Sequence, residues 1–218
     1  MSAPEAMPPE ARRAAMRLVG WALVLGGLGV LSWLAWMVLA TNATTKAAQE
    51  DLLEEWLRRG EAETPVIDGA AAQPAAGAGG PVAVMEFLRD GRRILHDEPV
   101  VVVAGVTAAD LTKGPGHYPG SALPGGPGNM AIAGHRTTYG APFADIDRLA
   151  EGDEIRVEDG DGVTWTYRVV EQRIVEPSDT TVIASDPLGN GRPTLTLTTC
   201  HPRYSNRQRL VVFAQLAP

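Results

Sequence analysis

Residues 194–202 read Thr-Leu-Thr-Leu-Thr-Thr-Cys-His-Pro, and this stretch decides the fold. The alternation of Leu and Thr is typical of a β-strand with one buried face. Pro202 cannot donate to a strand ladder, so we expect Cys200 where the strand gives way to a loop. Cys200 is the only cysteine, which excludes an internal disulfide and a cysteine-based metal site. Two readings remain: a buried structural thiol or a reactive one.

Further apolar runs, divided by turn residues, predict more strands on both sides of this one. They cover 82–87, 100–103, 130–133, 154–158, 164–175 and 210–215, with 194–199 as the strand before the cysteine. Asp159-Gly-Asp-Gly162 is a hairpin signal, and short helices are expected at Thr107–Leu111 and Pro142–Leu149. Many short strands with few helices predict an all-β domain, a closed barrel.

The N-terminal region contains a candidate membrane span. Residues 18–40 carry no charge, and at about 1.5 Å per residue such a helix crosses a hydrocarbon core of about 30 Å. Arginines precede the span and acidic residues follow it, which predicts a cytoplasmic segment 1–17 and an extracellular remainder. A cleaved signal peptide is the alternative, although its apolar region is usually only about 7–15 residues long.

Export makes the solitary thiol informative. An unpaired cysteine in an oxidising compartment is prone to oxidation, so we expect a protein to keep one only where the thiol has a function. This favours a reactive Cys200 over a buried structural one.

Between the span and the barrel we expect an extracellular connection over residues 41–80. Within it, Gln49–Arg59 has helical periodicity and predicts a stalk helix that packs on the domain or on the membrane surface. The Ala-, Gly- and Pro-rich stretch from Gly60 to Gly80 predicts a flexible linker. We expect residues 81–218 to form the main globular domain.

Charge argues against nucleic acid as a partner, because the net charge is −7 and no Lys/Arg cluster is present. Acidic residues gather over 151–161, but their spacing does not match a calcium loop, and a solvated hairpin explains them. We therefore expect neither a metal nor a cofactor.

A cysteine nucleophile needs a proton carrier and a group that stabilises negative charge. Among the four histidines, His135 follows the run Met130–Gly134 and so also lies at a strand end. Arg209 opens the last strand, nine positions after Cys200, where a turn could bring it back beside the thiol. For each, a purely structural or solvated residue is the alternative.

These residues resemble a known family. Thr196-Leu-Thr-Thr-Cys200 resembles the Thr-Leu-x-Thr-Cys signature of sortases, Ala133-Gly-His-Arg136 resembles their histidine block, and Arg209 falls where their arginine does. Three longer blocks in the same order, residues 114–122, 128–143 and 198–202, resemble the class E sortases of actinobacteria. The resemblance covers about Pro81 to Pro218.

The resemblance implies a closed eight-stranded barrel in which Cys200, His135 and Arg209 converge. Cys200 would cleave the Thr–Gly bond of a Leu-Ala-x-Thr-Gly-type sorting signal through a thioester. An amine of a lipid II-like cell-wall precursor would then take the acyl group. Tyr139 and Thr199 are candidate substrate contacts.

Two other hypotheses compete with this one. An exported L,D-transpeptidase also uses a cysteine, but its Ser-His-Gly-Cys arrangement is absent around Cys200. A membrane-tethered, non-catalytic binding module is the second, and the intact set of His135, Cys200 and Arg209 argues against it.

Overall fold

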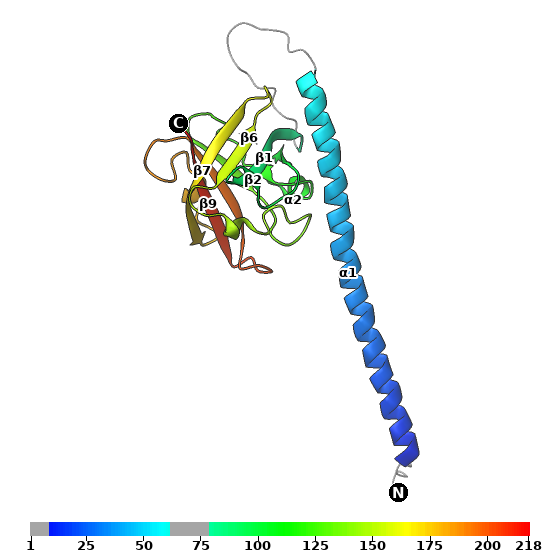
Figure 1. Ribbon diagram of the computed structural model, residues 1–218. Helices are drawn as coiled ribbons and strands as arrows, with labels where there is room; N and C mark the ends of the chain where they lie inside the picture. Colours follow the sequence, from blue (N-terminus) through cyan, green and yellow to red (C-terminus); the bar gives the residue numbers. More distant parts are fainter. Residues whose placement is uncertain (1–8, 62–78) are drawn as a thin grey trace. The chain divides into compact units, whose positions relative to one another are not determined.

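The computed structural model of the protein describes residues 9–61 and 79–218 (Figure 1). Most of the predicted linker therefore lies outside the described residues. The chain divides into two compact units, Met1–Ala40 and Thr41–Pro218. The second unit contains the barrel and also the last part of the long helix.

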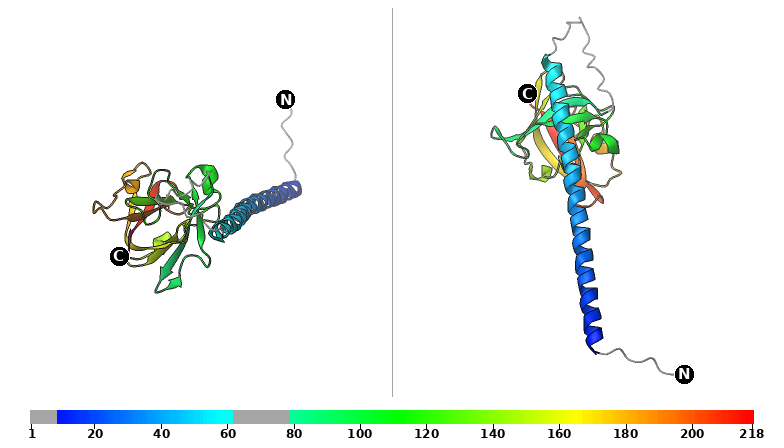
Figure 2. Two further views of the ribbon diagram at one scale, coloured as in Figure 1. Left: turned by 90° about the horizontal axis from the view of Figure 1, so that it is seen from above. Right: turned by 90° about the vertical axis from the view of Figure 1, so that its right-hand side faces the viewer.

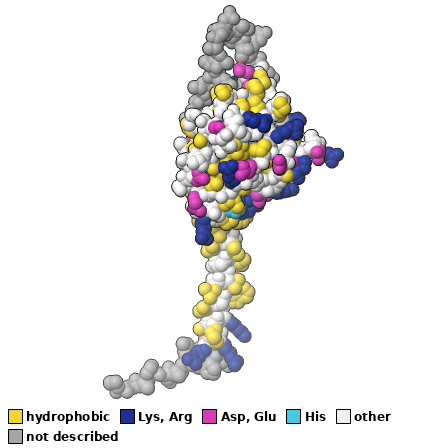
Figure 3. Space-filling model, turned by 90° about the vertical axis from the view of Figure 1, so that its left-hand side faces the viewer, with side chains coloured by type: hydrophobic (Ala, Val, Ile, Leu, Met, Phe, Trp, Pro, Cys, Tyr) yellow, Lys and Arg dark blue, Asp and Glu magenta, His cyan; other side chains and the backbone are white. Residues whose placement is uncertain are grey.

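Helix α1 (Pro9–Glu61) is continuous over 53 residues. A stretch of it is long and apolar enough to cross a membrane, with a mean hydropathy of 2.1 and none of that window buried. Figure 3 shows apolar side chains along this stretch, with Lys and Arg side chains near its start. The helix expected at 49–59 is not a separate element but the end of α1.

The strands form one sheet that closes on itself (Figure 2). The described strands are β1 (Pro81–Arg89), β2 (Arg92–Arg93), β3 (Val100–Ala104), β4 (Gly116–His117), β5 (Asn129–Ala133), β6 (Glu154–Glu158), β7 (Thr164–Val175), β8 (Thr194–His201) and β9 (Gln208–Leu216). Their order is β2-β1-β3-β4-β5-β8-β9-β7-β6, and pairing of β1 with β6 closes the ring. Since β2 pairs only with β1, eight strands make up the barrel, which confirms the predicted fold.

Every predicted strand is present, and the hairpin at Asp159–Gly162 joins β6 to β7. Strands β2 and β4 were missed because two residues carry no periodicity. The helix expected from Thr107 is α2 (Ala108–Leu111), with Thr107 as its N-cap in a capping box. The 3-10 turn η2 (Thr181–Ile183) was not predicted.

The helix predicted at Pro142–Leu149 was wrong, because only the 3-10 turn η1 (Ile146–Arg148) forms there. Two features explain the difference. Ala141 has a φ of 44°, outside the right-handed helical region, and the N–H of Phe143 donates to the carbonyl of His135. The segment is therefore tied to the end of β5 and does not turn into a helix.

Strand β8 has two distinct faces. Leu195 and Leu197 belong to the core inside the barrel. Thr196 and Thr198 take the opposite, outer face, because successive side chains alternate across a strand. By the same alternation, Cys200 lies on the outer face at the end of the strand.

The end of α1 packs on the outside of the barrel. Leu52 and Trp56 are buried against a cluster of valines from β1 and β3, and the indole N–H of Trp56 donates to Glu158 at 2.9 Å. The stalk helix thus packs on the domain. Leu57, in the same turn of the helix as Trp56, is 59% exposed.

We predict that Leu52→Ala lowers the free energy of unfolding by about 2–4 kcal/mol, because it empties a packed site between helix and barrel. Leu57→Ala is the matched control and should change it by less than about 0.5 kcal/mol. Denaturant unfolding of the full chain in detergent measures both. Equal effects of the two substitutions would contradict the helix–barrel packing.

Candidate active site

The parallel pairing of β5 with β8 sets the geometry of the site. Residues of β5 face residues of β8 at a constant offset of 65 positions, from Asn129 opposite Thr194 to Ala133 opposite Thr198. The pairing continues past the strand, because the N–H of Gly134 donates to the Thr198 carbonyl at 3.0 Å. The same offset brings His135 level with Cys200, and adjacent strands lie about 4.8 Å apart.

Arg209 joins them from the other side. Cys200 and Arg209 are direct partners in the antiparallel pairing of β8 with β9. Partners on one face have Cβ atoms about 4.5–5.5 Å apart. The Nη1 group of Arg209 donates to the carbonyls of Asn206 and Gln208 at 3.1 and 3.0 Å. Across residues 9–61 and 79–218, its Nε and Nη2 groups have no hydrogen-bond partner and remain free to bind an oxyanion.

His135 is held in a tight environment. A Cβ atom on the preceding Gly134 would lie 2.5 Å from the ring of Phe143, so only glycine fits there. The Nε2 atom of His135 is buried and has no hydrogen-bond partner within the described chain. Burial lowers the pKa of His135, which favours the neutral imidazole.

Tyr139 lies beside this histidine. The two rings are tilted by 39° with their centroids 5.0 Å apart. Tyr139 has a φ of 52°, in the left-handed region that non-glycine residues rarely adopt. The ring is therefore held against His135 by an unusual backbone conformation.

Thr199 does not share the outer face. It is 3% exposed, and its hydroxyl donates to the carbonyl of Gly134 at 2.7 Å. This bond ties the end of β5 to the end of β8. Substrate binding by Thr199 stays a prediction, while the structure gives its hydroxyl a protein partner.

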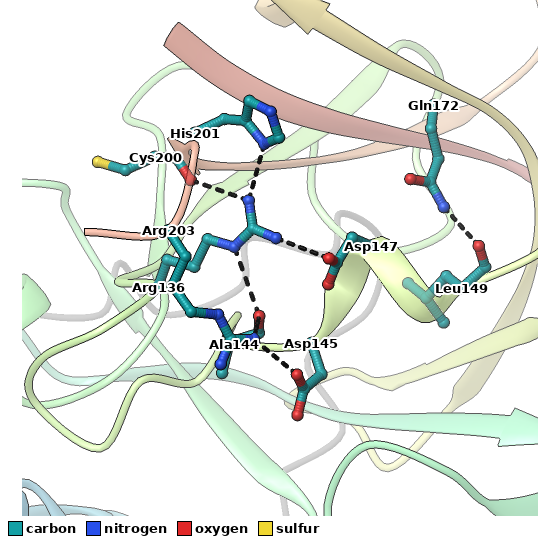
Figure 4. Close-up of polar contacts among 9 residues, drawn as sticks. All are labelled: Arg136, Ala144, Asp145, Asp147, Leu149, Gln172, Cys200, His201 and Arg203. Atoms are coloured by element: carbon teal, nitrogen blue, oxygen red, sulfur yellow. Dashed lines mark hydrogen bonds and ion pairs between the residues drawn. The ribbon is translucent and has the colours of Figure 1, made fainter. Parts of the chain in front are cut away.

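Arg136 was quoted in the sequence motif without a role, and the structure places it beneath the site (Figure 4). Its guanidinium is buried, donates to Nδ1 of His201 at 2.9 Å and to the carbonyl of Cys200 at 3.4 Å, and pairs with Asp147 at 2.8 Å. In Figure 4 the His201 ring faces this guanidinium, whereas the sulfur of Cys200 points away from it. Alternation along both strands was the available signal: His135 and Cys200 share one face, so Arg136 and His201 share the other.

The remaining histidines have structural partners. Nε2 of His117 donates to the Ala122 carbonyl at 2.8 Å, and Nε2 of His96 lies 2.8 Å from the Pro142 carbonyl. Burial lowers the pKa of His117, partly offset by its bond to Ala122. Neither residue is level with Cys200 in the pairing of β5 with β8.

Two loops border the outer face near the start of β5 and β8. The loop after β4 and the segment around η2 line a cavity of about 320 Å³, with Tyr118 on one side and Ile183 on the other. The Tyr118 hydroxyl lies 3.2 Å from the Thr198 hydroxyl, and the Asn129 side chain donates to the Ala184 carbonyl at 3.0 Å. These contacts join the two loops to the outer face of the barrel.

The acidic stretch has a structural explanation at Asp159, one of its two buried members along with Asp153. Asp159 accepts from the backbone N–H groups of Asp161 and Val163 and from the Trp165 indole. Its carboxylate thus closes the β6–β7 hairpin.

Stability should fall as the pH drops below about 6.5, the ordinary pKa of histidine. Burial lowers the pKa of both His117 and His135, so the unfolded chain binds more protons in the window below that value, and protonation favours unfolding. Denaturant unfolding at pH 7.5 and 5.5 measures the effect, and His117→Gln should reduce the difference. An unchanged difference in that variant would show that His117 does not contribute.

Arg136→Lys should cost about 1–3 kcal/mol of stability, because one ammonium cannot replace a buried guanidinium that bonds several acceptors at once. Arg203→Lys is the matched control: Arg203 bonds Ala144 and Asp145 nearby but is 41% exposed. Thermal unfolding compares the two. A larger loss of stability for Arg203→Lys than for Arg136→Lys would contradict the conclusion that the buried Arg136 guanidinium stabilises this part of the fold.

Comparison with known proteins shows the family. The sequence profile described as the sortase domain matches residues 94–217. Sortase D of Bacillus subtilis is 38% identical over 101 residues, which cover 46% of this chain and 48% of that protein. Sortase SrtE1 of Streptomyces coelicolor is 36% identical over 95 residues, which cover 41% of this chain and 26% of that protein. The matched regions thus span about half or less of these relatives.

Solved structures show the same fold. A sortase D5 transpeptidase of Clostridium perfringens superposes with a TM-score of 0.65 at 26% identity, over 79% of this chain and 99% of that one. Sortase E of Streptomyces avermitilis superposes with a TM-score of 0.56 at 38% identity, over 65% and 91% of the two chains. These similarities include both sortase D and sortase E proteins. Since the sortase profile matches more than half of its residues, the chain belongs to the sortase family.

Proposed function

We propose that this chain is a membrane-anchored cysteine transpeptidase of class E with Cys200 as its nucleophile. The main supporting observation is that His135, Cys200 and Arg209 lie side by side on the outer face, at the ends of three neighbouring strands. That arrangement brings together a nucleophile, a proton carrier and a fixed positive charge.

In the acylation step, the Cys200 thiolate attacks the carbonyl carbon of the Thr–Gly bond of a sorting signal. The free Nε and Nη2 groups of Arg209 are suited to stabilise the oxyanion that forms. The C–N bond then breaks, His135 gives a proton to the departing glycine amine, and a thioester remains on Cys200. The neutral His135 that burial favours takes the thiol proton beforehand.

In the second step an amine attacks the thioester. His135 accepts a proton from this amine, the C–S bond breaks, and the departing Cys200 thiolate takes that proton back from His135. We propose a cell-wall precursor amine, lipid II-like, as the acceptor and a Leu-Ala-x-Thr-Gly-type signal as the donor. The resemblance of the motif blocks to class E supports this choice of donor, with Tyr139 as a substrate contact beside His135.

The location follows from α1. Its apolar stretch has the length of a membrane span, and Arg12, Arg13 and Arg17 precede it, which favours a cytoplasmic N-terminus. We propose that Leu18–Ala40 is the anchor and that the barrel works outside the cell, where surface proteins and wall precursors meet.

Cleavage of a quenched fluorescent Leu-Ala-x-Thr-Gly peptide by the full chain in detergent tests the proposal. Cys200→Ala should lower cleavage by at least about a thousandfold. Arg209→Lys should lower it by about a hundredfold, because lysine keeps the charge but loses the fork. Arg192→Lys is the control, since Arg192 lies at the other end of β8 and bonds Gln215.

Two further readouts make the result decisive. Mass spectrometry should detect the acyl group on Cys200, and an added glycine peptide should convert hydrolysis into transfer. Cleavage that persists in Cys200→Ala would refute the nucleophile. Preference for a peptide with Pro in place of Ala would refute class E specificity while leaving the reaction type intact.

A further inference from the structure

The loop that carries Tyr139 is strained. Tyr139, Gly140 and Ala141 follow one another with φ values of 52°, 70° and 44°. Conformations of this kind are sparsely populated for residues other than glycine, and they persist only where surrounding contacts hold them. The loop follows His135 directly, so whatever holds it also fixes the surroundings of that histidine.

Helix α1 supplies one of these contacts. Oδ1 of Asn42 accepts a hydrogen bond from the N–H of Gly140 at 3.0 Å, at the centre of the strained segment. A Cβ atom on Gly140 would lie 3.2 Å from the methyl group of Thr45, so helix and loop are in close approach. The other bonds of the loop are internal or come after it, such as Ala141 N–H to the Thr138 carbonyl.

Packing around the loop is incomplete. The loop and the helix both border a cavity of about 420 Å³, whose lining includes Asn42, Tyr139 and Gly140. With open space beside the loop, the bond from Gly140 to Asn42 is the polar contact that joins its strained centre to another element of the described chain.

The helix is itself fixed to the barrel near this point. The buried Thr45 hydroxyl donates to the Thr112 carbonyl at 2.7 Å. The Gln49 amide bonds both the N–H and the carbonyl of Val101, at 2.9 and 3.0 Å, and also the Lys113 carbonyl. Strand β4 pairs with β3 only at Val103 and Ala104. At Val101 the Gln49 side chain therefore makes the hydrogen bonds that a neighbouring strand would otherwise make.

We propose that Asn42, in the first turn of α1 after its apolar stretch, is a positioning residue of the active site that acts through Gly140 to hold Tyr139 against His135. This inference rests on the proposed function only in naming His135 as the proton carrier. The membrane-proximal helix is then part of the catalytic unit as well as its tether.

The test compares Asn42→Ala, Asn42→Asp and Thr44→Ala in the full chain in detergent. Asn42 is exposed, and alanine suits a helix, so Asn42→Ala should fold. Aspartate keeps an acceptor oxygen for Gly140. Thr44 is the matched control, because its exposed hydroxyl bonds only the Thr41 carbonyl within the helix.

The first readout is the NMR signal of the His135 ring at one pH, assigned by its loss in His135→Gln. The Tyr139 ring shifts this signal through its ring current. Asn42→Ala should move it toward the position seen in Tyr139→Ala, whereas Asn42→Asp and Thr44→Ala should leave it in place. An unmoved signal in Asn42→Ala overturns the proposal.

The second readout is peptide cleavage. Asn42→Ala should lower kcat about two- to tenfold, the range expected for one lost hydrogen bond, and Asn42→Asp should restore it. Loss of activity without rescue by aspartate, and in step with a lower melting temperature, overturns the positioning role. If the unsubstituted chain cleaves no peptide, the proposed function fails, and the His135 signal still decides the role of Asn42.

Discussion

The site depends on the parallel pairing of β5 with β8. Because the offset between the strands is fixed, His135 and Arg136, which follow β5, lie level with the last two residues of β8. The two pairs of side chains point to opposite sides and form an outer and an inner layer. His135 and Cys200 share the outer layer, on the side of the strands away from the barrel core. Arg136 and His201 share the inner layer, where the guanidinium binds the imidazole and the Cys200 carbonyl. A slip of one residue would exchange the layers and bury the thiol.

Polar side chains keep this register in place. The Thr196 hydroxyl donates to the Asn129 side chain at 2.8 Å near the start of the two strands, and Thr199 donates to Gly134 at their end. Both threonines are almost fully buried, so each bond is shielded from water and a slipped register would leave its partners unsatisfied. The threonines of the signature therefore specify the pairing that brings the chemistry together.

Much of the fold and of the candidate site could be predicted from the sequence, and the features that could not be predicted have physical causes. Alternation of Leu and Thr predicted the strand, Pro202 predicted its end near Cys200, and strand ends pointed to His135 and Arg209. Roles that depend on contacts distant in sequence could not be read: Arg136 binds a residue 65 positions away. The missing helix at Pro142–Leu149 is similar, because the tie from Phe143 to His135 overrides the local preference.

The Gln49 side chain has a consequence for the barrel by itself. Without α1, the N–H and carbonyl of Val101 would lose their partner beside the apolar valines that Leu52 and Trp56 cover. An unpaired strand edge next to an apolar patch is a template on which other chains add strands. A fragment beginning at Pro81 would thus carry a surface prone to aggregation, which a fragment beginning at Thr41 keeps covered.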